Sequence, residues 1–228
     1  MSRLLLFAGC LMAGVLTACT DETTPTSFAL TAEIDVSRCA PGPGFTLVSS
    51  NDWFPIDVGR QWTLQGEEDG AQVDLVITVL DQIEPVGGVD TRVIQEEERH
   101  DGVLVEVSHN FFALTSDGTV CYFGEAVDIY ENGVVVSHAG AWRADEGENF
   151  PGIFMPAEPR VGLRYQMEGA PGVAEDAAQI IGSSSLDIAG VGSFPETIRV
   201  RESNPLEHGV GFKVFAPGVG LVIDGPLA

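Results

Sequence analysis

Three polar residues of different chemistry are predicted to meet on one face of a sheet: Asn110, Glu125 and His138. Two-residue hairpin loops at Asp117-Gly118 and Asn132-Gly133 would place Asn110 opposite Glu125, with His138 diagonal to Glu125. Opposed residues lie about 5 Å apart and diagonal ones about 7 to 8 Å, so the three side chains would be within reach of one another. A carboxylate among apolar neighbours has a raised pKa unless it is paired, and a histidine beside it stays charged. The pattern is typical of acid–base chemistry or of a buried structural pair.

The sequence leaves both interpretations of this cluster open. Gly140 is predicted to face Glu125 and to leave a space above its carboxylate, as a pocket would need. A Glu–His–Asn cluster inside a sheet also occurs as a satisfied part of a core, and any β-bulge would change the register that brings the residues together. As a metal site the cluster lacks the second histidine that zinc usually has.

Two further acidic groups have the oxygen ligands that a hard cation such as Ca²⁺ prefers. They are Glu175-Asp176 with Glu168, and Glu202 with Glu207. The Asp-x-Asp-x-Asp-Gly pattern of a calcium loop is absent, and acidic pairs in so acidic a chain are mostly solvated surface. We therefore predict no cofactor, with Ca²⁺ at Glu175 and Asp176 as the alternative.

The chain contains none of the common catalytic signatures. There is no Gly-x-Ser-x-Gly elbow, no phosphate-binding Gly-Lys-Ser/Thr, no His-Glu-x-x-His and no Cys-x-x-Cys. These absences favour a non-catalytic binding or structural protein, with a hydrophobic ligand or a protein partner. The alternative is a hydrolase or metal-dependent enzyme that uses Glu125, His138 and Asn110.

The elements that must position these residues are predicted strands. From Arg60 onward, segments with period-two alternation, such as Val103, Val105 and Val107, are separated by dipeptides that tolerate positive φ. The dipeptides are Asp69-Gly70, Gly87-Gly88, Asp101-Gly102, Asp117-Gly118 and Asn132-Gly133. This pattern predicts an all-β, single-domain fold: a long-stranded up-and-down antiparallel meander of about six strands that curls into a half-barrel or barrel-like sheet.

After the meander the pattern changes. Residues 145–162 carry three prolines and are predicted to form a long loop with an apolar tip at Phe154 and Met155. Residues 175–181 could alternatively form a helical turn or two. Shorter strands are expected after the loop, at 163–168, 177–184, 197–202, 212–215 and 220–223.

The first residues predict export and lipid anchoring. Residues 1–18 have a basic start and a short apolar run, as a secretory signal does, and Leu16-Thr-Ala-Cys19 resembles the bacterial lipoprotein box. We predict that Cys19 is acylated, that residues 19–51 form a flexible tether, and that 52–228 form the β domain. Thr20 after the cysteine resembles an outer-membrane sorting signal, facing the periplasm or the exterior. An ordinary signal peptide with an incidental cysteine is the alternative.

The chain is strongly acidic, with 34 Asp and Glu against 11 Lys and Arg. All the acids follow residue 18 and Arg3 precedes it, so the mature chain would carry a net charge of about −24. Such a charge repels nucleic acid and anionic membrane surfaces, which excludes nucleic acid as an expected partner. Solubility explains the acidity, and a binding site for cations or basic partners is the alternative explanation.

The cysteines predict one disulfide. Cys10 would leave with the signal and Cys19 would carry the lipid, which leaves Cys39 and Cys121 in an oxidising compartment. Their bridge would close a long loop. In the chain-entropy model this closure stabilises the fold by at most about 4 to 5 kcal/mol.

Six ordered motifs resemble a family of uncharacterised, secreted or lipid-anchored bacterial proteins. The similarity spans roughly residues 52–222 and implies a common fold without a known activity. Where that family leads us to expect tryptophan this chain has Cys121, which implies that the bridge is a local addition. The motifs are Cys121-Tyr-Phe-Gly-Glu125, Tyr130-Glu-Asn-Gly133, Pro151-Gly-Ile-Phe-Met-Pro-Ala157, Ala174-Glu-Asp-Ala177, Pro205-Leu-Glu207 and Phe215-Ala-Pro-Gly-Val-Gly-Leu-Val222.

Overall fold

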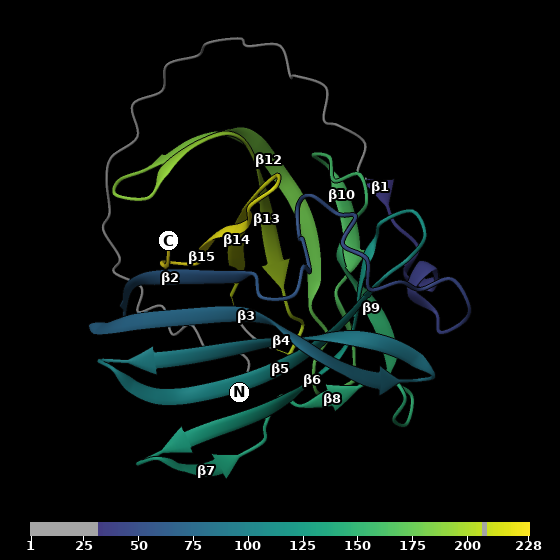
Figure 1. The fold of residues 1–228 in the computed structure, drawn as a ribbon, viewed down its shortest axis with the longest axis horizontal. Coiled ribbons are helices and arrows are strands. Elements are labelled where there is room, and N and C mark those ends of the chain that lie inside the picture. The colour runs from purple at the N-terminus through teal and green to yellow at the C-terminus, as the bar shows by residue number, and fades with distance from the viewer. Residues whose placement is uncertain (1–31, 207–208) are drawn as a thin grey trace, which may run out of the picture.

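Two β-sheets, one of nine strands and one of six, enclose a single hydrophobic core. The structure is a computed structural model, and it describes residues 32–206 and 209–228. In Figure 1 the first sheet crosses the lower half of the view, and the strands of the second run steeply across it behind and above. The predicted all-β, single-domain class is confirmed. Within the described residues, the one helical element is the short 3-10 helix η1 (Val36–Cys39).

The first sheet contains the predicted meander, and its strands end at the predicted turns. At Asp69-Gly70, Asp101-Gly102 and Asn132-Gly133 both residues have positive φ, between 49° and 83°, as a two-residue type I′ hairpin requires. Aspartate, asparagine and glycine tolerate this conformation best, so the dipeptides set where each strand ends. The strands are β2 (Gln61–Glu68), β3 (Ala71–Val86), β4 (Val89–His100), β5 (Val103–Leu114), β6 (Val120–Glu131) and β7 (Val134–Ser137), followed by the shorter β8 (Trp142–Arg143), β9 (Phe150–Met155) and β11 (Glu168–Gly169).

The predicted loop at 145–162 contains a buried strand instead, so that prediction was wrong. β9 pairs with β6, Met155 is fully buried, and Phe154 packs against the core, so neither residue lies at an exposed tip. The prediction assumed that the prolines exclude a central strand. Pro151 lies before the ladder with β6 and pairs with Glu168 of β11 on the other side of the strand. The residues of β9 paired with β6 are Gly152, Ile153 and Met155.

The C-terminal strands form the second sheet rather than an extension of the meander. Its order is β1-β10-β12-β13-β14-β15, and every pair after the first is antiparallel. β12 and β13 are longer than expected, at 12 residues each, and the helical alternative for 175–181 is wrong because β12 occupies that segment. The strands are β1 (Ala32–Glu33), β10 (Leu163–Gln166), β12 (Ala177–Ile188), β13 (Gly192–Ser203), β14 (Gly211–Ala216) and β15 (Gly220–Asp224).

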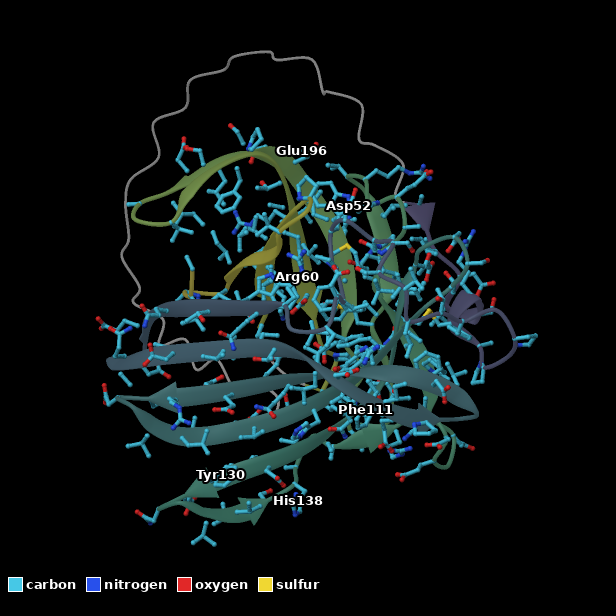
Figure 2. All side chains as sticks on the ribbon, in the orientation of Figure 1. Asp52, Arg60, Phe111, Tyr130, His138 and Glu196 are labelled. Carbon is cyan, nitrogen blue, oxygen red and sulfur yellow. A yellow bond between two sulfur atoms is a disulfide. The ribbon has the colours of Figure 1, made fainter. Side chains whose placement is uncertain are left out.

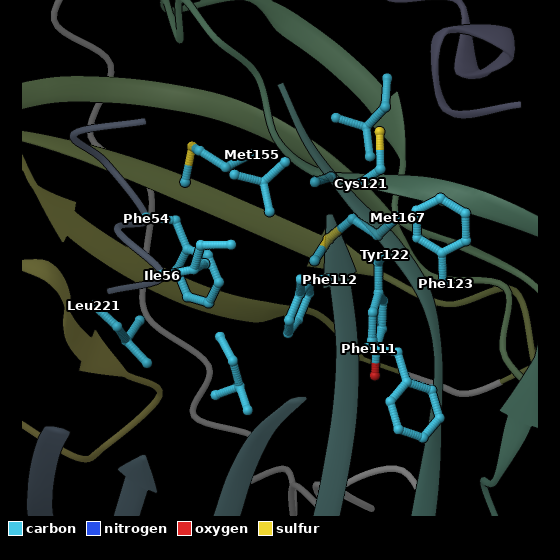
Figure 3. Close-up of a cluster of buried hydrophobic side chains, with 14 of the residues drawn as sticks. Phe54, Ile56, Phe111, Phe112, Cys121, Tyr122, Phe123, Met155, Met167 and Leu221 are labelled. Atoms are coloured by element: carbon cyan, nitrogen blue, oxygen red, sulfur yellow. The ribbon is translucent and has the colours of Figure 1, made fainter. Parts of the chain in front are cut away.

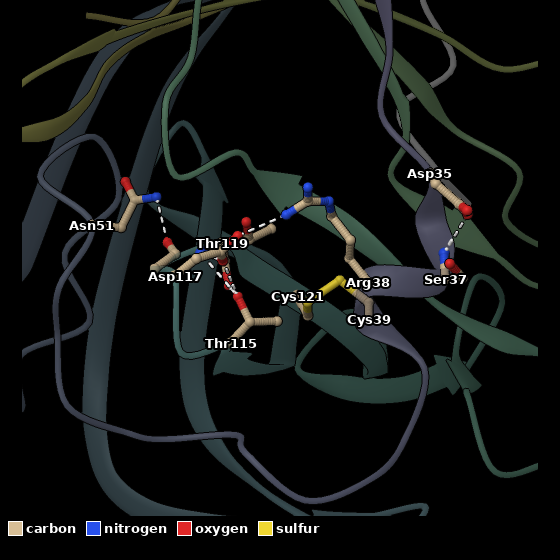
Figure 4. Close-up of a disulfide and its surroundings, with 10 residues drawn as sticks. Asp35, Ser37, Arg38, Cys39, Asn51, Thr115, Asp117, Thr119 and Cys121 are labelled. Atoms are coloured by element: carbon tan, nitrogen blue, oxygen red, sulfur yellow. Dashed lines mark hydrogen bonds and ion pairs between the residues drawn. A yellow bond between two sulfur atoms is a disulfide. The ribbon is translucent and has the colours of Figure 1, made fainter.

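The N-terminal residues that the structure describes lie on the β domain. We assigned 19–51 to a flexible tether, but from residue 32 onward the chain pairs with the sheets, and the domain therefore begins before residue 52. The predicted disulfide joins Cys39 to Cys121 with Cα atoms 5.6 Å apart (Figure 4), and both cysteines are fully buried. The bridge explains why this segment follows the domain surface.

The signal peptide at 1–18, the acylation site Cys19 and the first part of the tether lie outside the described residues. Within residues 32–206 and 209–228, no helix is long and apolar enough to cross a membrane.

A cluster of aromatic rings fills one end of the space between the sheets. Phe54 lies at its centre, with ring centroids 4.5 Å from Phe154, 5.4 Å from Phe112, 5.9 Å from Trp62 and 6.4 Å from Phe215. Figure 3 shows Phe54 and Phe112 side by side in this core. The rings come from both sheets and from the segment before β2, so they fix how the sheets sit relative to each other.

Candidate functional site

The pairing of β5 with β6 places Asn110 opposite Glu125, as predicted. The hairpin reaches this register by another route, because its loop runs from Thr115 to Thr119 and is longer than two residues. A bulge follows between Asn110 and Phe112 and restores the alignment. Its Gly124 has φ 129°, and a side chain there would collide with the backbone of Trp142. Glycine at this position therefore maintains the register at Glu125.

The predicted contact between Glu125 and His138 is wrong. A bulge near Ile129 shifts β7, and Glu125 pairs with Trp142 in place of Gly140. The Nδ1 atom of His138 lies 2.8 Å from the carbonyl oxygen of Val127 and 2.9 Å from Oδ1 of Asp128, and its side chain is 70% exposed. In Figure 2 His138 lies beside β7 at the edge of the first sheet, away from the second. The strand register was predicted from the turn dipeptides alone, and these do not indicate where a β-bulge shifts it.

Glu125 and Asn110 instead line a cleft between the two sheets, with a volume of about 240 Å³. Gly140 also borders it, so the predicted space beside Glu125 exists although the pairing that suggested it does not. Phe54, Tyr122 and Phe154 are among the lining residues and connect the cleft to the aromatic core. The titratable lining residues are Glu68, Glu96, Glu106, Tyr122, Glu125, Glu168, Asp176, Glu202, Lys213 and Asp224.

The acidic lining follows from the strand period. On β4 the buried Ile94 faces the core, and Glu96 is two residues further along the same face. Glu96 pairs with Ser108 on β5, whose same-face neighbour Glu106 also borders the cleft. Sequence reasoning missed both carboxylates, although extension of the period-two pattern past Ile94 would have found Glu96. Lys213 and Asp224, which are paired across β14 and β15, carried no comparable signal.

A hydrogen-bonded chain leads from Glu125 into the first sheet. Asn110 donates from Nδ2 to Oγ of Ser108 at 3.1 Å, and its Oδ1 accepts from the hydroxyl of Tyr122 at 2.6 Å. Tyr122 also contacts the Glu125 carboxyl. This hydrogen bond lowers the pKa of Glu125, against the raising effect of burial.

Burial, with the nearby Glu96 and Glu106 carboxylates, raises the pKa of Glu125 to about 8. Burial is also the main cause that raises the pKa of Glu168, and its hydrogen bond with Asp176 adds to the effect. Both side chains are half-buried on the cleft wall. At neutral pH Glu125 therefore holds its proton.

The second sheet contributes an ion pair that leaves one acceptor unused. Nζ of Lys213 lies 2.6 Å from Oε2 of Glu202 and 3.7 Å from Oδ1 of Asp224. The other Glu202 oxygen, Oε1, is buried and has no hydrogen-bond partner among the described residues. Burial raises the pKa of Glu202, against the lowering effect of Lys213.

Among the candidate calcium ligands, Glu175 lies apart from Asp176 and Glu168, which are hydrogen-bonded to each other. Oε1 of Glu175 accepts a hydrogen bond from the backbone of Gly172, whereas Asp176 lines the cleft and accepts one from Asn204. Glu168 and Glu202 line the same cleft, and Glu207 lies outside the described residues. In the described part of the chain, no three His, Cys, Asp or Glu side chains are arranged to hold a metal ion.

No protein-family model matches the chain, and no curated protein matches it. Among solved structures, the chain is similar to one described as a “putative lipoprotein” from Parabacteroides distasonis, with 13% sequence identity and a TM-score of 0.35. The similarity covers 75% of this chain and 89% of that chain. A likeness of this size assigns neither a family nor a function, so the function has to be inferred from the residues of the cleft.

Proposed function

We propose that this chain is a non-catalytic lipoprotein of the cell envelope that binds a small molecule with an apolar part in the cleft between its sheets. The observation that carries the proposal is the cleft itself, about 240 Å³ in volume and bordered by residues of both sheets. Its aromatic side chains, Phe54, Tyr122 and Phe154, offer apolar contact, and its convergent polar groups would orient a ligand. The volume is below the roughly 300 Å³ of drug-sized pockets, which favours a small ligand.

The anchoring part of the proposal rests on the sequence Leu16-Thr-Ala-Cys19. Acylation at Cys19 would hold the domain at the outer membrane through a linker that reaches the sheet at residue 32. A Cys19→Ala variant should move from the detergent phase to the aqueous phase in a detergent-partition assay. Equal partitioning of both forms into detergent would contradict anchoring at this residue.

A protein partner on the cleft is less well supported than a small molecule, because the aromatic lining lies inside the molecule and not on its surface. The enzymatic alternative is weakened, because its acid–base pair of Glu125 and His138 is not formed. His138 contacts Asp128 instead of Glu125, so the Glu–His–Asn site on which the hydrolase hypothesis depended is not assembled.

Native mass spectrometry of protein purified from membranes tests the binding proposal. We expect a bound small molecule on the wild type and its loss in Ala139→Trp, because Ala139 is exposed at the cleft wall and a tryptophan there would fill the space. Ala126→Trp is the matched control, since Ala126 is also exposed but does not line the cleft. The same bound mass on wild type and Ala139→Trp, or none on any form, would contradict the proposal.

A further inference from the structure

We infer that the ligand of the cleft is an organic cation, a primary ammonium group on a small apolar skeleton. This inference rests on the proposed function, and it names the class of molecule that the cleft would select. It draws on the charge of the lining residues, on a buried acceptor atom that lacks a donor, and on the position of the aromatic side chains.

The charge of the cleft is strongly unbalanced. Among the described lining residues Lys213 is the one cation, and it lies on β14 between Glu202 and Asp224. The other described residues that line the cleft include eight carboxyls and no base. The carboxyls that face Glu125 across the cleft or along its own wall are Glu68, Glu96, Glu106, Glu168, Asp176, Glu202 and Asp224.

One buried carboxyl oxygen in the cleft lacks a hydrogen-bond donor, which is an observation independent of the charge count. Oε1 of Glu202 is buried without a partner among the described residues. A buried acceptor without a donor costs free energy, so the cleft is stabilised by anything that supplies donors there.

A primary ammonium group supplies three donors and one positive charge, and Oε1 of Glu202 lacks such a donor. A metal ion fits the cleft less well, because it needs several oxygens converging on one point, and no such group exists in the described residues. Tyr122, Phe54 and Phe154 stand on the same cleft wall as Glu125 or close to it. Their rings can contact both an apolar skeleton and, by the cation–π interaction, the charge.

Binding of such a cation would be linked to proton release. An ammonium group favours the ionised form of a neighbouring carboxyl, so it lowers the pKa of the carboxyls that it contacts. Glu125, with a pKa of about 8, and the raised carboxyls Glu168 and Glu202 would release protons as the ligand enters. The affinity for the cation should therefore rise between pH 6 and pH 8.

Isothermal titration calorimetry with three matched probes tests the inference on the full chain in detergent. The probes are phenethylamine, its neutral analogue 2-phenylethanol and the anion phenylacetate. We expect phenethylamine to bind at least tenfold more tightly than the alcohol at pH 8, phenylacetate not to bind, and phenethylamine to bind about tenfold more weakly at pH 6. Buffers of different ionisation enthalpy should reveal proton release only with the amine.

Two variants test which carboxyls bind the ammonium group. Glu202→Gln and Glu125→Gln should each weaken the binding of phenethylamine at least fivefold at pH 8. The affinity for 2-phenylethanol should not change. Glu97→Gln is the control, because Glu97 is on the opposite face of β4, where it pairs with Arg99. Thermal melting of each variant confirms that it is folded.

The outcomes separate the two proposals. Equal binding of the amine and the alcohol, or tighter binding of phenylacetate, would overturn the cation inference and leave the cleft as a binding site. Absence of binding by all three probes, together with the absence of any ligand from the native protein, would overturn both. Unchanged amine binding by both cleft variants would also overturn the inference.

Discussion

The two ends of the space between the sheets differ in chemistry although the same strands build both. At one end alternate residues of the first sheet are apolar, and rings such as Phe112 and Trp62 close around Phe54. Further along the same faces, Glu96 and Glu125 replace apolar residues, and the sheets leave a cleft. The aromatic end holds the fold together, whereas the acidic end costs stability because burial raises the pKa of Glu125, Glu168 and Glu202 there. A feature that costs stability and encloses a cavity is typical of a binding site.

The Cys39–Cys121 disulfide should give the largest effect on stability. Replacement of both Cys39 and Cys121 by serine should lower the free energy of unfolding by up to about 4 to 5 kcal/mol, because the closed loop spans a sequence separation of 82 residues. Urea denaturation measures the loss. Thiol labelling of the denatured, unreduced wild type should find neither cysteine, and full labelling of both would contradict the bridge.

Phe54→Ala should be almost as damaging, at about 3 to 5 kcal/mol, because it removes the ring that contacts both sheets. Val134→Ala is the matched truncation on an exposed residue, 64% accessible, and should change stability by less than about 0.5 kcal/mol. Similar losses for the two variants in urea denaturation would show that the aromatic end is not the part that stabilises the fold.

At the acidic end a substitution should stabilise the protein, whereas the substitutions described above destabilise it. An unfolded glutamate has a pKa near 4.5, and Glu125 in the folded protein has one of about 8. Between these values the unfolded state releases a proton that the folded state keeps, so the wild type loses stability as the pH rises from 4.5 to 8. Glu125→Gln removes this loss and should stabilise the protein by roughly 2 kcal/mol at pH 8.

The pH dependence is the check on this prediction. Urea denaturation at a series of pH values should show the two proteins converging near pH 4.5, where both states hold the proton. A loss of 3 kcal/mol or more in Glu125→Gln at pH 8 would mean that Glu125 belongs to a buried ion pair.

The smallest effect is expected at His138, outside both regions. Its side chain is 70% exposed and that of its partner Asp128 is 40% exposed, so His138→Ala should cost less than about 1 kcal/mol. Asp128→Asn should have an effect of similar size in the same urea assay. A large loss from either variant would place His138 in a buried cluster after all.

Local signals in the sequence predicted the meander. Each turn dipeptide acts on its own backbone, as the positive φ values of Asp69, Asp101 and Asn132 show. The Cys39–Cys121 bridge followed from counting the cysteines, since two remain when Cys10 is assigned to the expected signal peptide and Cys19 to the expected lipid site. The alternation along β4 also contained the acidic face, because Glu96 is in phase with the buried Ile94.

Only the tertiary structure decided which predicted partners meet. A bulge beside Gly124 kept Asn110 opposite Glu125, and a second one near Ile129 separated Glu125 from His138. β9 became a buried strand because β6 offered a free edge to it, which its own prolines did not suggest. Glu202 and Lys213 reached the cleft from a second sheet that the turn pattern did not predict. Turns and alternation depend on neighbouring residues, whereas bulges, strand partners and the cleft depend on residues far apart in the chain.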